Sequence, residues 1–269
     1  MIDPADLEEL RPLLERHGAK PVKRLGQNFL VDASLRDRVA SAAGIEADED
    51  VLEIGAGPGA LSIRLAERAA RLTCIEIDPR LVAALAEVTA GQDNVDIVRG
   101  DALKLDLPDA AVAAGNIPYH ITGKLLPKLL ERPRPPRRLS LVVQREVAER
   151  WTSPSDWSLA SLAVHVYTEP RLEFVLPAGA FWPRPEVDSA CVHLTVRPRP
   201  ALDATPAFFG FAERIFQFRR KQLGASLARL GHGDPAVRLQ RLGIDPQRRP
   251  QTLSLEEWRR LFGEFAADL

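Results

Sequence analysis

Asp50-Val51-Leu52-Glu53-Ile54-Gly55-Ala56-Gly57-Pro58-Gly59 is the stretch that decides the fold. Its first half predicts a short strand, because apolar residues dominate it and a glycine-rich turn ends it. Its second half predicts a tight turn that opens a helix, where glycines let the backbone approach a ligand closely. A strand, a glycine-rich turn and a helix in this order are typical of the first unit of a nucleotide-binding α/β domain.

Strands and helices alternate along the chain around this turn, which predicts βαβ units and a mainly parallel sheet. We expect strands at 50–54, 71–77, 94–98, 110–114, 138–144, 164–167 and 190–196, and helices at 5–17, 34–43, 60–68, 79–90 and 122–130. Beyond the stiff linker Arg197-Pro198-Arg199-Pro200 the pattern is helical, at 206–217, 221–230, 235–242 and 255–267. We therefore predict an α/β domain over 1–196, with an N-terminal helical and basic segment at 1–43, and a small all-helical domain over 197–269.

Length and composition exclude several classes of protein. The 269 residues suffice for one large and one small domain. No apolar run approaches the ~20 residues of a membrane helix, and the acidic start of the chain lacks the order of a signal peptide. Cys74 and Cys191 are two lone cysteines, which indicate a reducing compartment, no disulfide framework and two buried thiols. No His or Cys cluster has metal-ligand spacing. We expect a cytoplasmic protein without a metal or a membrane partner.

The net charge of −1 conceals a segregation of charge along the chain. Residues 44–109 carry 14 acidic and 6 basic side chains. Residues 197–269 carry 8 acidic and 13 basic side chains, and residues 128–150 carry 3 acidic and 7 basic. This separation is typical of a protein that binds a cationic or polar cofactor in one place and a polyanion in another.

Glu76 ends the second expected strand, 21 residues after Gly55. A carboxylate at this position can accept hydrogen bonds from both ribose hydroxyls of an NAD-type cofactor or of S-adenosylmethionine. Gly55, Gly57 and Ala60 also satisfy the dinucleotide pattern, so the turn and Glu76 together leave both cofactors open.

Three features favour S-adenosylmethionine. Glu53, two residues before the first glycine, suits a cofactor with a positively charged amino-acid end better than a pyrophosphate. Gly100-Asp101, after the third strand, offers a carboxylate to an adenine amine. Asn116-Ile117-Pro118-Tyr119, after the fourth, places an amide, a proline-stiffened turn and an aromatic face together. These groups suit a flat base with an exocyclic amine, and they have no role in hydride transfer.

With these motifs the chain resembles the ribosomal RNA adenine dimethyltransferases, and in particular the bacterial group that modifies small-subunit RNA. The resemblance extends from Lys23 to Phe262. The motifs that carry it are, in chain order, Leu25-Gly26-Gln27-Asn28-Phe29-Leu30, the turn from Glu53 to Gly59, Glu76-Ile77-Asp78, Gly100-Asp101-Ala102, Asn116-Ile117-Pro118-Tyr119, Gln144-Arg145-Glu146-Val147-Ala148, Phe181-Trp182-Pro183-Arg184-Pro185-Glu186-Val187-Asp188-Ser189-Ala190, Phe218-Arg219-Arg220-Lys221 and Gly243-Ile244-Asp245-Pro246.

The resemblance implies a Rossmann-like class I methyltransferase sheet with a small C-terminal all-helical domain. It implies S-adenosylmethionine-dependent dimethylation of the N6 amines of two adjacent adenosines in the 3′-terminal hairpin of 16S rRNA, with a role in small-subunit biogenesis. The partner would be 16S rRNA or the immature small ribosomal subunit, and we expect the protein to act as a monomer.

The resemblance also implies roles for individual residues. Those expected to bind the cofactor are Gln27, Asn28, Leu30, Glu53, Gly55, Gly57, Glu76, Ile77, Asp101, Ala102 and Asn116. Asn116 and the carbonyl group of Ile117 would accept hydrogen bonds from the target amine, Pro118 would stiffen the turn, and Tyr119 and Phe181 would stack on the target adenine. We expect RNA contacts at Lys23, Arg24, Arg145, Arg219, Arg220 and Lys221. His120 is not needed as a general base, because the amine proton can leave after methyl transfer.

Three alternatives stay open beside this interpretation. One is the sister group that dimethylates 23S rRNA and confers antibiotic resistance, whose members are markedly basic throughout, unlike this chain with its pI near 6.5. Another is a non-catalytic RNA- or DNA-binding relative, against which the intact Asn116 to Tyr119 motif argues. A dehydrogenase is the third. Trp151 and Trp157 flank an expected surface loop, where a core role and an RNA contact are both open.

Overall fold

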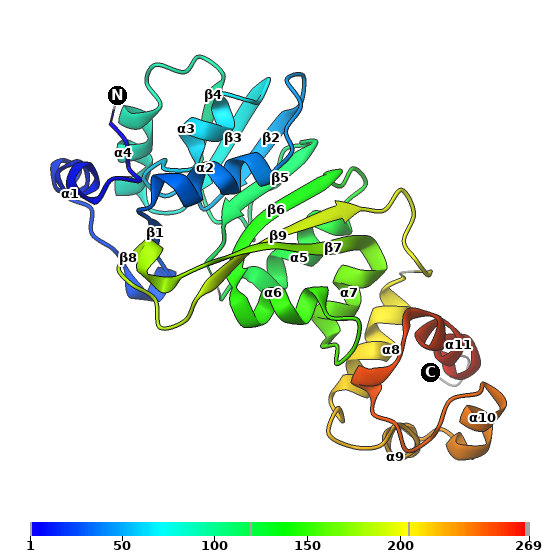
Figure 1. Cartoon of the computed structure of the whole chain (residues 1–269). Helices are drawn as coiled ribbons and strands as arrows, with labels where there is room; N and C mark the ends of the chain where they lie inside the picture. Colours follow the sequence, from blue (N-terminus) through cyan, green and yellow to red (C-terminus); the bar gives the residue numbers. More distant parts are fainter. Residues whose placement is uncertain (1, 119, 204, 267–269) are drawn as a thin grey trace. The chain divides into compact units, whose positions relative to one another are not determined.

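The computed structural model describes residues 2–118, 120–203 and 205–266, and a seven-stranded sheet forms its centre (Figure 1). The strand order is β4-β3-β2-β5-β6-β9-β7. The strands are β2 (Asp50–Ile54), β3 (Arg71–Glu76), β4 (Val95–Arg99), β5 (Val112–Asn116), β6 (Arg138–Gln144), β7 (Thr168–Leu176) and β9 (Ser189–Val196).

The first five strands in this order run parallel, and β9 lies antiparallel to β6. Parallel strands that are covered on both faces form continuous apolar runs. Four of the five residues of β5 are accordingly buried, as are four of β2. All carboxyl ends of parallel strands lie at one edge of the sheet, and the strand order changes direction between β2 and β5, where ligands bind in such sheets.

Helices cover both faces of the sheet. In Figure 1, α2 lies in front of the sheet and α5 behind it. The helices that precede or connect the parallel strands are α1 (Leu7–Arg16), α2 (Ala33–Ala42), α3 (Ser62–Ala66), α4 (Pro79–Val88) and α5 (Thr122–Leu130). Val39 and Ala40 of α2 pack into the same buried cluster as Val51 and Leu72 of the sheet. Within the described ranges, no helix combines the length and the apolar composition needed to cross a membrane.

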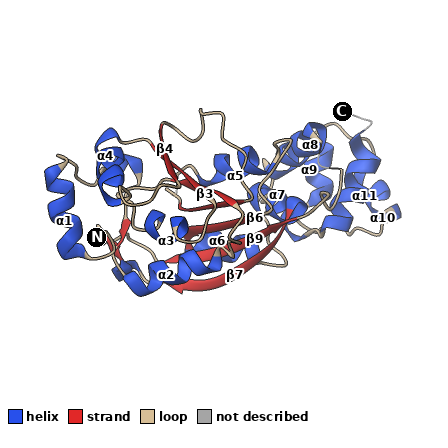
Figure 2. Cartoon of the chain, turned by 90° about the horizontal axis from the view of Figure 1, so that it is seen from above, coloured by secondary structure: helices blue, strands red, loops and turns tan. Residues whose placement is uncertain are grey.

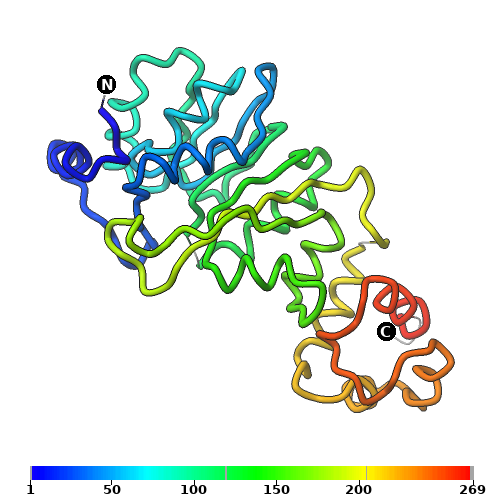
Figure 3. Tube along the Cα trace, viewed as in Figure 1, coloured from blue at the N-terminus to red at the C-terminus, as the bar shows by residue number. Residues whose placement is uncertain are grey.

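A two-stranded ribbon joins segments that lie far apart in the sequence. Its strands are β1 (Phe29–Leu30) and β8 (Phe181–Trp182), which pair antiparallel so that Leu30 faces Phe181. Short 3-10 turns, η1 (Lys23–Leu25) and η2 (Ala178–Ala180), precede the two strands. Figure 3 shows the dark blue and yellow-green stretches side by side. The ribbon therefore ties the N-terminal segment to the Phe181 motif.

The chain divides into two compact units. One comprises Met1–Ala148 with Pro170–Val196, and the other comprises Glu149–Glu169 with Arg197–Leu269. The sequence predicts a single boundary near Val196, whereas the structure groups residues 149–169 with the C-terminal helices. An unpredicted helix, α6 (Arg145–Thr152), contains the first passage of the chain between the units.

The second unit is helical and has an aromatic core. Its elements are α7 (Leu159–Tyr167), α8 (Pro206–Phe216), α9 (Leu223–Arg229), α10 (Pro235–Arg241), η3 (Pro250–Thr252) and α11 (Leu255–Phe265). Phe208 packs edge-on against Trp258 and Phe262, with ring centroids 6.3 and 5.4 Å apart. Trp151 and Trp157 are buried, so their surroundings favour the core role over an RNA contact.

The strand expected at 164–167 is wrong. These residues form the last part of α7, which Figure 2 draws as a helix. Alternating valines favour a strand locally, but Ser158 caps a helix by accepting a hydrogen bond from the Ser161 backbone. The helix then buries Leu162, Val164 and Val166 among its neighbours. The edge strand β7 begins directly after it and was not anticipated.

Candidate active site

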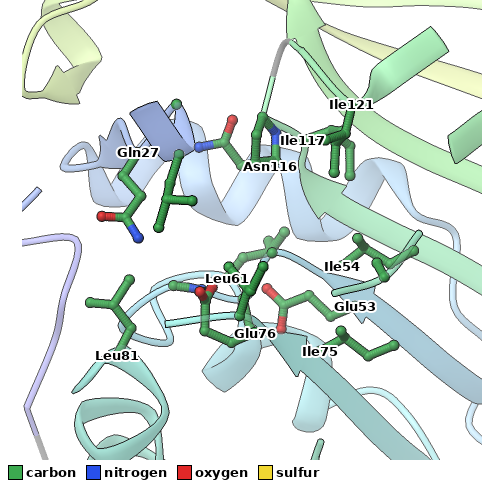
Figure 4. Close-up of a pocket in the computed structure, with 18 of the residues that line it drawn as sticks. Gln27, Glu53, Ile54, Leu61, Ile75, Glu76, Leu81, Asn116, Ile117 and Ile121 are labelled. Carbon is green, nitrogen blue, oxygen red and sulfur yellow. The ribbon is translucent and has the colours of Figure 1, made fainter. Parts of the chain in front are cut away.

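A pocket of about 350 Å³ opens at the carboxyl ends of the parallel strands (Figure 4). Its walls come from the ends of β2, β3, β4 and β5 and from residues 25–30 of the N-terminal segment. This volume suits a nucleoside-sized ligand. The pocket is lined by all eleven residues that the sequence predicts as cofactor contacts, namely Gln27, Asn28, Leu30, Glu53, Gly55, Gly57, Glu76, Ile77, Asp101, Ala102 and Asn116.

The glycine-rich turn fixes the carboxylate at the end of β3. Gly57 has φ +58°, a left-handed conformation that favours glycine, and its N–H donates to Glu76 Oε2 at 2.9 Å. The other oxygen of Glu76 accepts from the Asp78 N–H at 2.8 Å. Burial raises the pKa of Glu76 above its ordinary value, against these backbone donors. The carboxylate is thus held in one orientation at the pocket wall.

Glu53 is the most buried acid of the pocket, with 1% of its surface exposed. Its Oε2 accepts hydrogen bonds from the Ser62 hydroxyl at 2.6 Å and from the Cys74 thiol at 3.3 Å. Burial raises the pKa of Glu53 to about 7, and the charge of Glu76 adds to the rise. Figure 4 shows Glu53 and Glu76 on neighbouring strands, lining the same side of the pocket.

Asn116 is placed by a close approach of two backbones. Gly115 precedes it, and a Cβ atom at Gly115 would lie 2.3 Å from the carbonyl oxygen of Ile54. Only glycine therefore lets the end of β5 lie so near β2. The side-chain Nδ2 of Asn116 donates to the Asn28 carbonyl at 2.8 Å. With the nitrogen engaged in this way, Oδ1 is the end of the amide that can accept a hydrogen bond from a ligand.

The charge of the pocket has one sign. Its described lining includes three carboxylates, Glu53, Glu76 and Asp101, and contains neither lysine nor arginine. Asp101 is oriented by the Leu103 N–H, which donates to its Oδ1 at 2.9 Å. Ile77, 45% exposed, offers an apolar surface on which a flat ring can lie. Such a lining suits a cationic or neutral ligand and disfavours a pyrophosphate.

The predicted target-base contacts are only partly gathered here. Asn116, Ile117 and Pro118 line the pocket, while Tyr119 lies outside the described residues. Phe181 does not line the pocket. Its side chain is 3% exposed and packs with Leu30 in the core of the first unit.

The six predicted RNA contacts all have exposed side chains, and none lines the pocket: Lys23, Arg24, Arg145, Arg219, Arg220 and Lys221. Among the described residues, no three His, Cys, Asp or Glu side chains converge as metal ligands. The expected absence of a metal stays a prediction. Cys74 and Cys191 are free and buried, as the sequence predicts.

Several residues of the site escaped the sequence interpretation. Ser62 and Cys74 support Glu53 from α3 and β3, and neither carries a local sequence signal for this contact. Asp78 caps α4, and the nearby Arg80 lowers the pKa of Asp78. The Asp-Pro start of a helix could have indicated this cap. His120 also lines the pocket, beside Gly26.

Comparisons with known proteins agree with this geometry. The family described as ribosomal RNA adenine dimethylase matches residues 18–267. The chain belongs to this family. Membership confirms the identification made from the motifs, and with it the class of enzyme, an rRNA adenine dimethyltransferase.

Curated relatives of this dimethylase match over nearly their whole length. Ribosomal RNA small subunit methyltransferase A of Pelotomaculum thermopropionicum is 42% identical over 289 residues, which cover 98% of each chain. The protein of the same name from Moorella thermoacetica is 40% identical over 268 residues, which cover 91% of this chain and 93% of the relative.

Solved structures confirm the fold of the dimethylase. A dimethyladenosine transferase from Plasmodium falciparum superposes with a TM-score of 0.77 at 24% identity, covering 87% of this chain and 96% of that one. The 23S rRNA methyltransferase ErmE superposes with a TM-score of 0.71 at 30% identity, covering 88% and 99%. The predicted fold class is therefore confirmed, a Rossmann-like class I methyltransferase sheet followed by a helical C-terminal region.

Proposed function

We propose that the protein transfers methyl groups from S-adenosylmethionine to the N6 amines of two adjacent adenosines in the 3′-terminal hairpin of 16S rRNA. The observation that carries this proposal is the position of Asn116. Its amide is oriented by Asn28 at the edge of a pocket that is lined by carboxylates and has no lysine or arginine in its described lining. An acceptor for an exocyclic amine thus lies next to a site for a cationic cofactor.

The residues present fit S-adenosylmethionine better than a nicotinamide dinucleotide. Three carboxylates and no described cation line the pocket, so the two phosphates of a dinucleotide would meet like charge. Glu76 would hold the ribose hydroxyls, Asp101 the adenine amine, and Ile77 one face of the adenine ring. Gln27 and Asn28 would close over the methionine end. When bound, this cofactor supplies an electrophilic methyl group on a sulfonium sulfur.

The protein's own residues position the target amine. The N6 lone pair of adenine is delocalised into the ring, which makes the amine a poor nucleophile. Asn116 Oδ1 and the Ile117 carbonyl would accept its two hydrogens and favour a more pyramidal nitrogen that points into the pocket. Alignment of the reacting atoms then accounts for most of the rate acceleration, and no general base is required. The target base must leave its stack to reach these groups.

The choice of RNA rests on the relatives. The proteins that match over at least nine-tenths of both chains are named for the small ribosomal subunit, at 40 and 42% identity. The 23S enzyme ErmE is 30% identical. We therefore propose 16S rRNA in the immature small subunit as the substrate, a monomer as the acting form, and the cytoplasm, where ribosomes assemble, as its place of action. The exposed cations at Arg219, Arg220 and Lys221 would contact phosphates.

The test is to incubate the protein with labelled S-adenosylmethionine and either unmodified 30S particles or unmodified 23S rRNA. We expect N6,N6-dimethyladenosine at two adjacent positions near the 3′ end of 16S rRNA. Mass spectrometry of nuclease fragments locates the modification. Dimethylation of 23S rRNA instead would transfer the protein to the sister group, and label in neither RNA would refute the proposal.

A further inference from the structure

Glu53 differs from the other two carboxylates of the pocket in what holds it. Glu76 and Asp101 accept backbone N–H groups. Glu53 accepts from two side chains, the Ser62 hydroxyl at 2.6 Å and the Cys74 thiol at 3.3 Å. Both donors reach the same oxygen, Oε2, so Oε1 is left to face other groups. A buried acid held by side chains can be tuned by changing those side chains.

We propose that Ser62 and Cys74 are positioning residues that present the Glu53 carboxylate to the cationic part of the cofactor, and that cofactor binding removes a proton from Glu53. This inference rests on the proposed function, because it takes S-adenosylmethionine as the ligand. It adds two residues and a proton to that function.

The surroundings of Glu53 in the ligand-free pocket favour its neutral form. From β3, the charge of Glu76 and the thiol of Cys74 face it, and from α3 the hydroxyl of Ser62. Asp101 and His120 line the same pocket from the segments after β4 and β5. No described lysine or arginine lines the pocket to compensate the carboxylates. Desolvation and like charge both penalise a second ionised acid here.

A cationic ligand reverses this balance. Burial raises the pKa of Glu53 to about 7 in the ligand-free protein. A positive charge beside the carboxylate favours ionisation and lowers the pKa of the bound state. Binding therefore releases a proton when the pH is below about 7. The affinity for the cation rises with pH until Glu53 is ionised in the free protein, and is constant above that point.

Cys74 limits how strongly the protein favours ionised Glu53. Burial raises the pKa of the Cys74 thiol well above its ordinary value, so the group stays a thiol and a weak donor. A hydroxyl at this position would donate more strongly to Oε2 and favour the carboxylate. Removing either donor would favour the acid.

The experiment is calorimetric titration with S-adenosylmethionine between about pH 5.5 and 7.2, below the range in which an α-amino group titrates. All proteins carry His120→Gln, so that the imidazole in the pocket cannot contribute. We expect affinity to rise about tenfold per pH unit on the acidic limb. Cys74→Ser should displace this limb to lower pH, and Cys74→Ala and Ser62→Ala should displace it to higher pH.

Two controls separate a tuned carboxylate from a structural effect. Cys191→Ser changes the other buried cysteine, which contacts Ser140 and does not line the pocket, and should leave the limb in place. 5′-Methylthioadenosine lacks both positive charges of the cofactor, and its affinity should not rise with pH. Should Cys74→Ala fail to fold, the near-isosteric Cys74→Ser carries the test alone.

The outcomes distinguish this inference from the function on which it rests. Binding of S-adenosylmethionine with no rise in affinity from about pH 5.5 to 7.2 overturns the inference and leaves the function standing. Equal displacement by Cys191→Ser and Cys74→Ser also overturns it. Failure of the wild-type protein to bind S-adenosylmethionine at any pH would instead refute the proposed function.

Discussion

At the scale of single residues, the site depends on which atom of a side chain is left available. The Asn116 nitrogen donates to the Asn28 carbonyl, and this one hydrogen bond leaves the oxygen for an incoming amine. Gly115 acts in the same place by having no Cβ at all. Each residue has a consequence that one substitution can measure.

Replacing Asn116 with alanine should separate binding from turnover. The variant keeps the carboxylates of the pocket, so affinity for S-adenosylmethionine should change by less than about threefold. Loss of the acceptor for N6 should lower kcat about 100-fold or more, within the range expected when one positioned group is removed. Calorimetry and single-turnover methylation give the two values. A collapse of cofactor affinity with little change in kcat would contradict the positioning role.

Gly115→Ala should destabilise the fold. Its Cβ would lie 2.3 Å from the Ile54 carbonyl oxygen, so β5 must move away from β2 at the pocket. We expect a loss of about 2 kcal/mol or more in the free energy of unfolding. Gly123→Ala is the matched control, since nothing lies within 4 Å of the Cβ position there and Gly123 is in α5. That change should be neutral or stabilise by up to about 1 kcal/mol. Urea unfolding measures both, and equal losses would refute the steric argument.

At the scale of elements, the ribbon of β1 and β8 connects two motifs that the sequence treats separately. Leu30 belongs to the segment that lines the cofactor pocket, and Phe181 was expected to stack on the target base. The structure pairs them across the ribbon, and the Val31 N–H donates to the Ala180 carbonyl at 2.8 Å. Phe181 is therefore placed to support the cofactor side of the site from beneath.

Truncating Phe181 should for this reason weaken cofactor binding. Phe181→Leu leaves a void under Leu30 and should raise the Kd for S-adenosylmethionine several-fold, with a loss of stability of about 1 to 3 kcal/mol. Phe174→Leu is the matched control, because Phe174 packs on the same core but lies outside the pocket lining. It should cost stability without changing the Kd. If Phe181→Leu instead lowers only kcat with RNA, the stacking role implied by the family resemblance is correct.

Elements with a strong local signal could be predicted from the sequence, and those set by tertiary contacts could not. The helix at 122–130 and the strand at 138–144 have the predicted bounds, because apolar periodicity and flanking prolines define them. The segment 164–167 was misassigned, since its valines favour a strand while the Ser158 cap and its packing form a helix. In the site, the strand-end residues carry motifs. Ser62 and Cys74 do not, because a contact between α3 and β3 has no pattern in the sequence.

At the scale of the whole molecule, opposite charges are assigned to different parts of the chain. Residues 44–109, which supply much of the pocket, carry 14 acids and 6 bases, and residues 197–269 of the second unit carry 8 acids and 13 bases. An acidic pocket repels phosphates. Attraction of RNA must therefore come from exposed cations elsewhere, and the junction of α8 and α9 offers three in sequence, Arg219, Arg220 and Lys221.

Neutralising these three residues together should weaken RNA binding without touching the cofactor. Each phosphate contact contributes about 0.7 to 0.9 to the slope of log K against log salt, so the triple alanine variant should lower that slope by about 2 to 3. Affinity for S-adenosylmethionine should be unchanged, because none of the three lines the pocket. Arg241→Ala/Arg249→Ala removes exposed charge from the same unit away from the junction and should change the slope less per charge. Filter binding to 30S particles at several salt concentrations measures the slopes. Equal loss per charge in both variants would mean that the unit attracts RNA through its net charge and that the junction makes no specific contact.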